Sequence, residues 1–504
     1  MATPASQVTT SVRTALFIGG KERQTAEQMA IADPAKPGVV VGHAAHATPQ
    51  DVSDAVAAAK AAYPAWASLT PQQRAEKMLA AIEGVPDSPN PFASEDGALL
   101  SQENGKIRLE GWVDALVLQI RWKLALMHAD EVGQAKVLKP VPGHIPTETT
   151  VSYQPLGVVT IIVPFNWPIA ILGAALPHAL LAGNTVIVKP ALTAPLATAR
   201  VVQRIAEKLP PGVLNVITGP DANMKGLVQN PDIAKVCFTG SVGGGKKIME
   251  LASGSLTRVT LELGGNDAAI FLKDAVLDDT HLDRLYAAIY DTTGQICMNA
   301  KRVYVHRSRM DELVNGLAKR LEKVKLGYGL DPATNMGPLH SPVQKKFVEE
   351  LIAEAKASGA KVLEFGELPG GDMAGGNFVR PAIVVNPDPK LRVVTEEQFG
   401  PVIPIIPFDD VEDAIKAAND TWAGLAGSVW SADEQAAHRV ADRLVTGYIW
   451  INDHGATRLD LRAPFGGMKA SGMGREQGIE GIRAFQDTRS ISHLDAAVLA
   501  SMAH

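Results

Sequence analysis

A long uncharged stretch constrains this chain more than any other feature, because residues 149–188 contain no Asp, Glu, Lys or Arg. A run of this length invites a transmembrane interpretation. Five polar or helix-breaking residues interrupt it: Pro164, Asn166, Pro168, His178 and Asn184. Prolines inside the run would break a membrane-spanning helix. The stretch therefore predicts two buried strands around a loop and a buried helix, and argues against a membrane protein.

Strand-like and helical patterns alternate through this part of the chain. Apolar, β-branched runs predict strands at residues 156–163, 185–189, 213–218 and 234–239. Helical patterns lie between them at residues 194–208 and 222–229. Buried strands that alternate with helices predict an α/β fold with a parallel, doubly wound sheet. Such a sheet offers a Rossmann-type dinucleotide site at its strand ends.

A second α/β block extends from about residue 264 to 465. Its predicted strands are 268–272, 302–306, 383–385 and 448–451, and its predicted helices are 310–324 and 344–358. The glycine-rich residues 366–377 are typical of a loop. Segments 144–153 and 490–493 alternate polar and apolar residues, which predicts exposed strands that await a partner chain.

Composition excludes several classes of protein. A chain of 504 residues predicts two or three domains, and a net charge of -6 offers no broad attraction for nucleic acid. Two cysteines cannot form a disulfide scaffold and favour a reducing compartment, here the cytoplasm. No metal-ligand spacing occurs, so we expect no catalytic metal. Residues 1–13 lack the apolar core of a signal peptide.

The two cysteines lie in contrasting contexts. Cys237 lies within an apolar strand pattern, which is typical of a core residue. Cys297 follows Gly294 and Gln295 just before a predicted strand, where a side chain can be exposed at the end of a sheet. A lone cysteine is more often a core residue than a nucleophile, so Cys297 needs partners to be a convincing candidate.

Three further motifs supply such partners. Glu262 precedes a pair of glycines, where it either closes a turn or acts as a general base. Asn166 lies in a loop stiffened by two prolines, where its amide is a fixed donor for an oxyanion. Gly240 and Ser241 stand between a predicted strand and a glycine-rich helix start, where backbone amides can approach a phosphate. Each motif alone would be an ordinary turn.

In this order and spacing, the motifs resemble the aldehyde dehydrogenase superfamily from about Val39 to Ser492. The resemblance implies a dinucleotide-binding domain (1–131 and 152–263), a catalytic domain (264–470) and a small β oligomerisation arm (132–151 and 480–496). It also implies a homodimer or homotetramer. Cys297 would attack the aldehyde, Asn166 would stabilise the oxyanion, and Glu262 would activate the water that hydrolyses the thioester.

The resemblance also assigns an NAD or NADP site. Its residues would be Phe165, Lys189, Leu192, Gly240, Ser241, Glu397 and Phe399. Many NAD-preferring relatives have a Glu at the position of Leu192, which binds the ribose 2′-hydroxyl and repels a 2′-phosphate. Leucine does neither, so we expect that NADP is accepted.

The substrate pocket is implied only in outline. By resemblance it contains Trp167, Ile296, Met298, Leu459 and Phe465. These side chains are apolar and favour an aromatic or medium-chain aliphatic aldehyde. Arg458 or Arg462 in the same loop could instead bind the carboxylate of a semialdehyde acid, unless it is solvent-exposed or pairs with Asp460. A CoA-acylating enzyme and a non-enzymatic protein remain alternatives, which Glu262 and the intact set of motifs disfavour.

Overall fold

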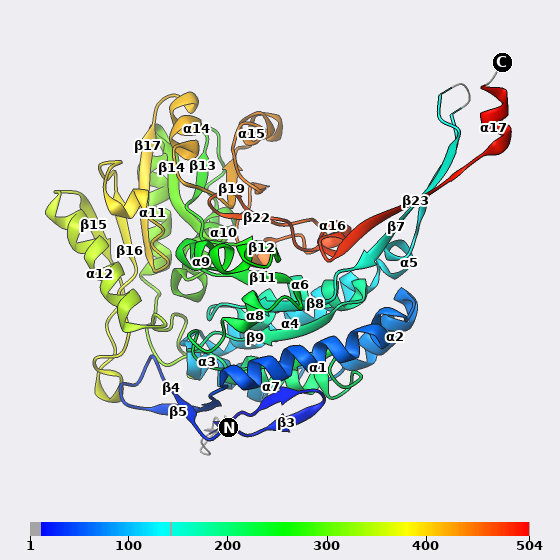
Figure 1. Cartoon of the computed structure of the whole chain (residues 1–504). Helices are drawn as coiled ribbons and strands as arrows, with labels where there is room; N and C mark the ends of the chain where they lie inside the picture. Colours follow the sequence, from blue (N-terminus) through cyan, green and yellow to red (C-terminus); the bar gives the residue numbers. More distant parts are fainter. Residues whose placement is uncertain (1–11, 142–143, 503–504) are drawn as a thin grey trace.

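The computed structural model describes residues 12–141 and 144–502 and contains two lobes and a protruding arm (Figure 1). Each lobe is built on a mixed sheet flanked by helices, so the predicted α/β class is confirmed. The prediction that residues 1–13 are not a signal peptide falls mostly on residues 1–11, which lie outside the described residues. Among the helices in the described ranges, none is both long and apolar enough to cross a membrane.

The first lobe contains an eight-stranded sheet within the described residues. In spatial order its strands are β22 (Gly472–Met473), β12 (Arg258–Glu262), β11 (Ile233–Thr239), β8 (Val158–Ile162), β9 (Thr185–Lys189), β10 (Leu214–Val216), β2 (Leu16–Ile18) and β3 (Lys21–Arg23). The five strands from β12 to β10 are parallel, and antiparallel strands complete both edges. From residue 158 onward the uncharged run forms β8, a buried helix and β9, as its pattern predicts, whereas residues 149–155 belong to a further strand that is only half-buried.

Helices cover both faces of this sheet. They are α1 (Pro49–Ala67), α2 (Pro71–Ala81), α3 (Glu95–Asn104), α4 (Arg108–Leu126), α5 (Ala129–Val132), α6 (Pro168–Ala182), α7 (Leu196–Ala206), α8 (Gly226–Gln229), α9 (Val242–Ser253) and α16 (Gly478–Arg483). A small sheet of β1 (Val12–Arg13), β5 (Val40–Ala45) and β4 (Gln28–Ala32) lies beside them. The expected helix at 222–229 is wrong in its first half. Turns occupy that half, and the amide of Asn223 donates to Ala47 O at 3.0 Å instead of facing a helix surface.

The register of the parallel strands brings their carboxyl ends to one edge. Ile162 pairs with Lys189, and Thr239 pairs with Glu262. Loops that leave such an edge are where α/β folds bind ligands. The backbone of the sheet alone therefore places the predicted cofactor residues and the predicted general base, Glu262, in one region.

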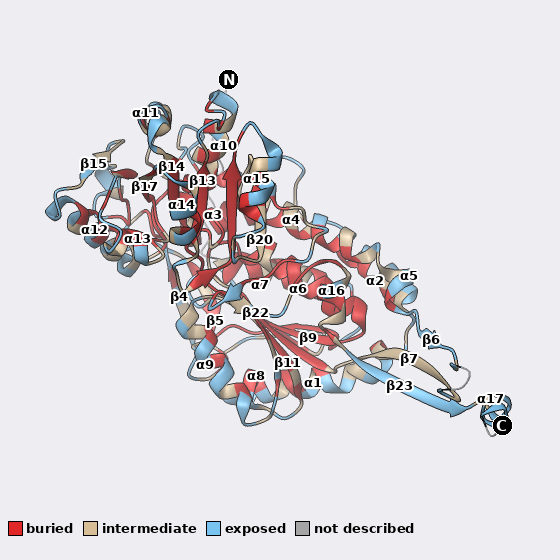
Figure 2. Cartoon of the chain, turned by 90° about the horizontal axis from the view of Figure 1, so that it is seen from above, coloured by how far each residue is buried: buried red, intermediate tan, exposed pale blue. Residues whose placement is uncertain are grey.

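The second lobe contains a seven-stranded sheet within the described residues. In spatial order its strands are β15 (Lys361–Glu364), β16 (Ala382–Val385), β17 (Val402–Phe408), β14 (Ala300–His306), β13 (Asp267–Phe271), β19 (Ala426–Trp430) and β20 (Tyr448–Ile451). Its helices are α10 (Asp279–Tyr290), α11 (Met310–Leu321), α12 (Pro342–Ala357), α13 (Arg392–Thr395), α14 (Val411–Asn419) and α15 (Glu434–Ala441). A short ladder joins β18 (Ala423–Gly424) to β21 (Met468–Lys469). Figure 2 shows that the central strands of both lobes, such as β9, β11, β13 and β14, are buried, whereas β23 of the arm is exposed and β7 is intermediate.

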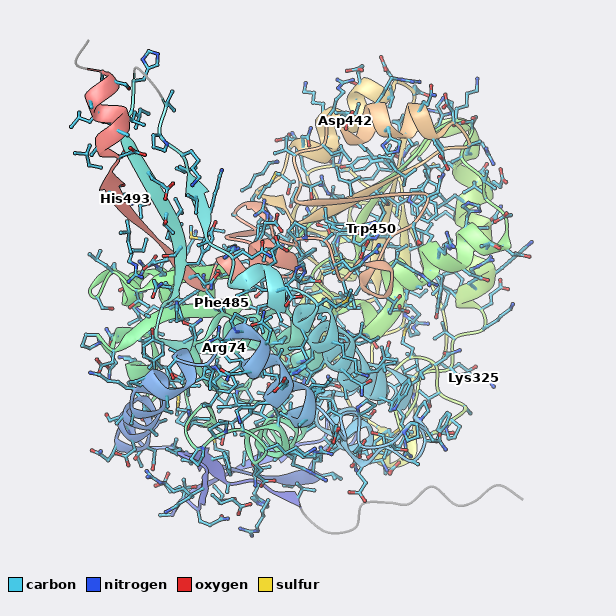
Figure 3. The ribbon with its side chains drawn as sticks, turned by 90° about the vertical axis from the view of Figure 1, so that its right-hand side faces the viewer. Arg74, Lys325, Asp442, Trp450, Phe485 and His493 are labelled. Carbon is cyan, nitrogen blue, oxygen red and sulfur yellow. The ribbon has the colours of Figure 1, made fainter. Side chains whose placement is uncertain are left out.

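The arm consists of β6 (Lys136–Leu138), β7 (Thr147–Pro155) and β23 (Gln486–Leu494), followed by α17 (Ala496–Ser501). The two segments predicted to be exposed strands pair with each other, because β23 runs antiparallel to β7 over its whole length. Figure 3 shows Phe485 at the base of the arm and His493 far along it, away from both lobes. The outer edge of β23 has no strand beside it among the described residues.

Candidate active site

Cys297 lies in a loop at the interface of the two lobes. A turn with strained backbone angles directly precedes it. After α10 the chain forms a short 3-10 turn, Asp291–Gly294, in which Thr292 and Thr293 adopt positive φ angles of 54° and 57°. Gly294 also has a positive φ, and a Cβ there would overlap the carbonyl oxygen of Gly400. Glycine is therefore required where this loop meets the segment that carries Glu397.

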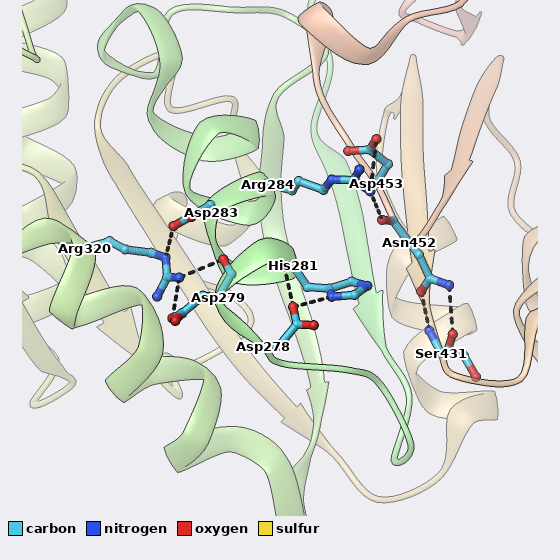
Figure 4. Close-up of polar contacts among 9 residues, drawn as sticks. All are labelled: Asp278, Asp279, His281, Asp283, Arg284, Arg320, Ser431, Asn452 and Asp453. Atoms are coloured by element: carbon cyan, nitrogen blue, oxygen red, sulfur yellow. Dashed lines mark hydrogen bonds and ion pairs between the residues drawn. The ribbon is translucent and has the colours of Figure 1, made fainter.

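The helix that leads into this turn is anchored from two sides (Figure 4). Arg320 of α11 donates to the carboxylate of Asp283 at 2.6 Å. On the other side, Arg284 donates to the carbonyl of Asn452 at 3.4 Å. The side chain of Asn452 forms a reciprocal pair of hydrogen bonds with the backbone of Ser431, at 2.8 and 2.9 Å. These contacts hold the first half of α10 against α11 and against the segment that follows β20.

Asn166 lies directly beside that loop. Its Nδ2 donates to the carbonyl of Gln295 at 2.9 Å, while the indole of Trp167 donates to Thr292 Oγ1 at 2.9 Å. The amide of Asn104 in turn donates to Asn166 O at 3.2 Å. The loop after β8 and the Cys297 loop are thus joined by buried hydrogen bonds. The structure brings together the predicted nucleophile and the predicted oxyanion donor.

Glu262 ends β12 and is buried. In the described part of the chain, neither oxygen of its carboxyl group has a partner within ordinary hydrogen-bond geometry, although the backbone amide of Gly467 lies near enough to lower its pKa slightly. Burial and the neighbouring Glu476 carboxylate raise the pKa of Glu262 well above its usual value. Burying a carboxyl group with so few hydrogen bonds costs folding free energy. Such a group indicates a site where a water molecule or a polar ligand can bind. A raised pKa also makes the ionised form a stronger base.

Burial raises the pKa of the Cys297 thiol to about 12, with smaller contributions from the carboxylates of Glu397 and Asp267. Burial raises the pKa of Cys237 to about 12 as well. The two thiols therefore differ in place rather than in acidity. Cys237 packs in the core of the first sheet, whereas Cys297 lines a cavity.

Glu397 lies beside the glycines that follow Glu262. Its Oε1 accepts a hydrogen bond from the Gly265 amide at 3.3 Å. Burial raises the pKa of Glu397 to about 7, against the ammonium of Lys301, which lowers it. Lys301 is buried, donates to Gly294 O at 3.2 Å, and lies 5.3 Å from the ring centre of Phe399. One cation thus holds the Cys297 loop and the Glu397 segment together.

A cavity of about 560 Å³ opens at the carboxyl edge of the first sheet. Among the predicted cofactor residues, its lining includes Phe165, Lys189, Leu192, Gly240 and Ser241. Ser241 caps α9 and accepts a hydrogen bond from the Gly244 amide at 3.1 Å. A Cβ on Gly240 or Gly244 would press on the Phe238 ring, so the glycines let the helix start approach closely. Helix amides, a buried lysine and this volume fit a dinucleotide.

Leu192 and Lys189 have different surroundings within that cavity. Leu192 is 39% exposed, and its apolar side chain offers no acceptor to a ribose hydroxyl. Lys189 Nζ lies 2.6 Å from Asp221 Oδ1, and that carboxylate is itself largely exposed. The predicted Glu397 and Phe399 do not line this cavity, but the ring centre of Phe399 is 6.0 Å from that of Phe165, which does.

A second, smaller cavity of about 70 Å³ lies at Cys297. Its lining residues come from both lobes: Val113, Val117, Arg121, Asn166, Trp167, Ala170, Ile171, Ile296, Cys297, Met298, Ala456 and Thr457. Leu459 and Phe465 do not line it, but they belong to the same apolar cluster as Trp167, Ile296 and Met298. The walls of this cavity are therefore mostly apolar.

The two arginines that were candidate carboxylate ligands do not line this cavity. Arg462 is exposed and forms two hydrogen bonds to Asp460, at 2.9 and 2.7 Å. Arg458 is exposed, and its carbonyl accepts a hydrogen bond from Trp450 at 3.1 Å. For Arg462, the structure thus shows the alternative in which the side chain is exposed and pairs with Asp460.

Sequence reasoning missed three charged residues at this site: Arg121, Lys301 and Glu476. Arg121 lies on α4, far from the motifs along the chain, and lines the Cys297 cavity. Glu476 is held by an isolated antiparallel bridge to Phe465. A charge within an otherwise apolar helical stripe was the only available signal for Arg121. Within the described residues, no group of three His, Cys, Asp or Glu side chains could hold a metal ion.

Comparisons with known proteins match almost the whole chain to the same kind of enzyme. The model of the aldehyde dehydrogenase family matches residues 21–491. A betaine aldehyde dehydrogenase of Bacillus subtilis (strain 168) is 34% identical over 447 residues, which are 88% of this chain and 89% of that protein. A betaine aldehyde dehydrogenase from Staphylococcus aureus, solved in complex with NAD+, is 31% identical, with a TM-score of 0.89 and coverage of 96% of this chain and 95% of that chain. An E. coli NADP-dependent enzyme is 30% identical, with a TM-score of 0.89 and coverage of 96% and 98%.

Proposed function

Because this chain belongs to the aldehyde dehydrogenase family and is an NAD(P)-dependent enzyme, we propose that it oxidises an aromatic or medium-chain aliphatic aldehyde to the carboxylic acid. Cys297 is the nucleophile and Glu262 the general base. One observation carries the proposal: Cys297 lines a mostly apolar cavity together with Asn166, and the buried carboxyl group of Glu262 lies close enough to raise the pKa of the Cys297 thiol.

The division of labour follows from side-chain chemistry. The Cys297 sulfur attacks the aldehyde carbon, and its proton leaves to a base. The oxygen of the resulting thiohemiacetal receives a hydrogen bond from Asn166 Nδ2, whose loss should slow the reaction by about 10²–10³-fold. After oxidation the thioester is hydrolysed by a water that Glu262 deprotonates, a contribution of about 10²–10⁴-fold. Glu262 therefore favours hydrolysis over transfer to CoA.

The cofactor site fits the same chemistry. A bound nicotinamide supplies the hydride acceptor. Ser241 and the start of α9 would hold the phosphates, Lys189 the adenosine ribose, and Glu397 the nicotinamide ribose. Leu192 supports acceptance of NADP because it presents no carboxylate to repel a 2′-phosphate.

The central experiment exploits the two cysteines. Cys297→Ala should keep its circular dichroism spectrum and its cofactor affinity, measured by fluorescence titration, but form no NADH or NADPH with any aldehyde. Cys237→Ala is the matched control. It makes the same substitution at the other cysteine, in the core of the first sheet, and activity should persist. Residual oxidation by Cys297→Ala above about 1% of the wild-type rate would overturn the assignment.

A substrate screen tests the apolar walls. We expect higher kcat/KM for benzaldehyde and hexanal than for acetaldehyde, because longer apolar chains bury more surface against Val113, Val117 and Met298. Failure to oxidise any neutral aldehyde would contradict the proposed substrate class. A requirement for free CoA would revive the acylating alternative.

The arm supports an assembly of copies. The exposed β23 has a free edge among the described residues, and such an edge pairs readily with another strand. We therefore include a homodimer or homotetramer in the proposal. Light scattering after size-exclusion chromatography would measure the mass, and a monomer at micromolar concentration would contradict it.

A further inference from the structure

Arg121 is the one cation among the described residues that line the Cys297 cavity. It continues a stripe on α4, since Val113, Val117 and Arg121 are spaced four residues apart and all three face the cavity. The first two are apolar. Arg121 therefore interrupts an apolar wall at its inner, buried end, where it is 8% exposed.

The guanidinium of Arg121 is only partly satisfied. Its Nη1 donates to the carbonyl of Ala170 at 2.6 Å. Its Nε is buried and has no partner among the described residues, and no described carboxylate lies within 4.0 Å of the group. A guanidinium carries five donors in a planar fork, and one hydrogen bond of this group is observed among the described residues, so donors remain unused at a residue that lines the cavity. A buried cation in this state is costly unless a ligand completes it.

The surrounding fold makes room for this side chain. Gly173 of α6 lies against it, and a Cβ at that position would be 3.2 Å from both Cβ and Cδ of Arg121. A larger residue at 173 would push the arginine away from the helix. The position is thus built from two elements, α4 and α6, rather than left to a mobile surface chain.

The nearby carboxylates do not complete Arg121. Asp114 is already engaged, because it accepts hydrogen bonds from Lys106 Nζ at 2.7 Å and from the Ala170 amide at 2.5 Å. Glu476 interacts with Arg121 electrostatically but lies beyond ion-pair distance. Burial raises the pKa of Glu476, which makes this neighbour a weaker counter-ion for Arg121 than an exposed carboxylate would be. An incoming anion could therefore accept hydrogen bonds from the unused donors of the Arg121 guanidinium.

We propose that Arg121 binds the carboxylate of the substrate, so that the preferred aldehyde has an apolar body and an acid group. This rests on the proposed function of the same cavity and names its substrate class more closely. A carboxylate matches the planar fork in a bidentate manner, which neutral groups do not. The apolar stripe of Val113 and Val117 then contacts the body of the substrate, while Cys297 receives its aldehyde carbon.

The test compares aldehydes that differ only in the acid group. The pairs are 4-formylbenzoate with benzaldehyde, and 6-oxohexanoate with hexanal. For wild-type enzyme we expect kcat/KM to be higher for the acid in at least one pair. In Arg121→Met, the ratio of acid to neutral kcat/KM should fall about 10–100-fold, as expected for lost hydrogen bonds to a charged group. Arg121→Lys should fall in between, because a lysine retains charge without the fork.

Arg462→Met is the matched control, since it removes an exposed arginine that is already paired with Asp460. Its acid-to-neutral ratio should equal that of the wild type. A wild-type preference for the neutral member of both pairs would overturn the proposal without any variant. An unchanged ratio in Arg121→Met would overturn it as well, and would assign the arginine to Glu476. In either case, continued oxidation of benzaldehyde would leave the proposed function standing.

Discussion

Gly264→Ala is a small change with a large expected effect on the cofactor site. A Cβ at this position would overlap Oε2 of Glu397 and lie 3.1 Å from its Cδ. The φ of Gly264 is not positive, so the backbone accepts alanine, and Ser471 continues to donate to its carbonyl at 2.7 Å. The only conflict is between the new methyl group and the carboxylate. Trp422 lies 3.4 Å from the same Cβ and limits escape on its side.

The carboxylate must therefore turn away from the position in which we propose that it holds the nicotinamide ribose. It would also lose its hydrogen bond to the Gly265 amide. A hydrogen bond to a charged group contributes about 1.5–3 kcal/mol. The KM for NAD should accordingly rise about 10–150-fold, measured by initial rates at saturating aldehyde.

A double-mutant cycle makes this reasoning refutable. Glu397→Ala removes the carboxylate and should raise the KM for NAD to a similar extent. Adding Gly264→Ala to it should then cost almost nothing, because the overlapping atom is gone. Gly254→Ala is the control, since a Cβ there meets nothing within 4 Å. Full additivity of Gly264→Ala and Glu397→Ala would refute the explanation.

Three further predictions follow from the same site. Because burial raises the pKa of Glu397 to about 7, the KM for NAD should increase as the pH falls from 8 to 6 and the carboxylate is protonated; a pH profile of initial rates checks this, and a flat profile would contradict it. Leu192→Glu should raise the NAD-to-NADP ratio of kcat/KM by about 10²-fold or more, whereas a wild-type preference for NAD above about 100-fold would oppose our interpretation of Leu192. Lys106→Met strands the buried Asp114 carboxylate and should lower the free energy of unfolding by about 3–5 kcal/mol in urea titrations, with partial recovery when Asp114→Asn is added.

The sequence predicts most of the first sheet because its strands are buried on both faces. A continuous apolar run such as Thr185–Lys189 has one structural solution, and β9 occupies those residues. The helix expected at 222–229 is wrong in its first half for a local reason, while α8 occupies the second half. The pattern there is short, and Asn223 prefers a side-chain contact with the backbone of residue 47.

The predicted site residues came from motifs, but their proximity is a property of the tertiary structure. Glu262 ends a strand of one sheet, whereas Cys297 precedes a strand of the other. No spacing along the chain specifies that these two ends face each other. Arg121 shows the same limit more sharply, because its role depends on how α4 packs against α6, and Gly173 is the residue that permits this packing.

The charges around Cys297 also explain why the thiol needs its partners. With a pKa of about 12, it would be ionised on the order of 10⁻⁴ at pH 8. Carboxylates at Glu397, Asp267 and Glu262 oppose its ionisation, while Lys301 favours it. Any event that neutralises one of these carboxylates, or places positive charge beside the sulfur, must lower the thiol pKa. If Glu397 holds the nicotinamide ribose as we propose, the carboxylate that helps to bind the cofactor also opposes ionisation of the nucleophile.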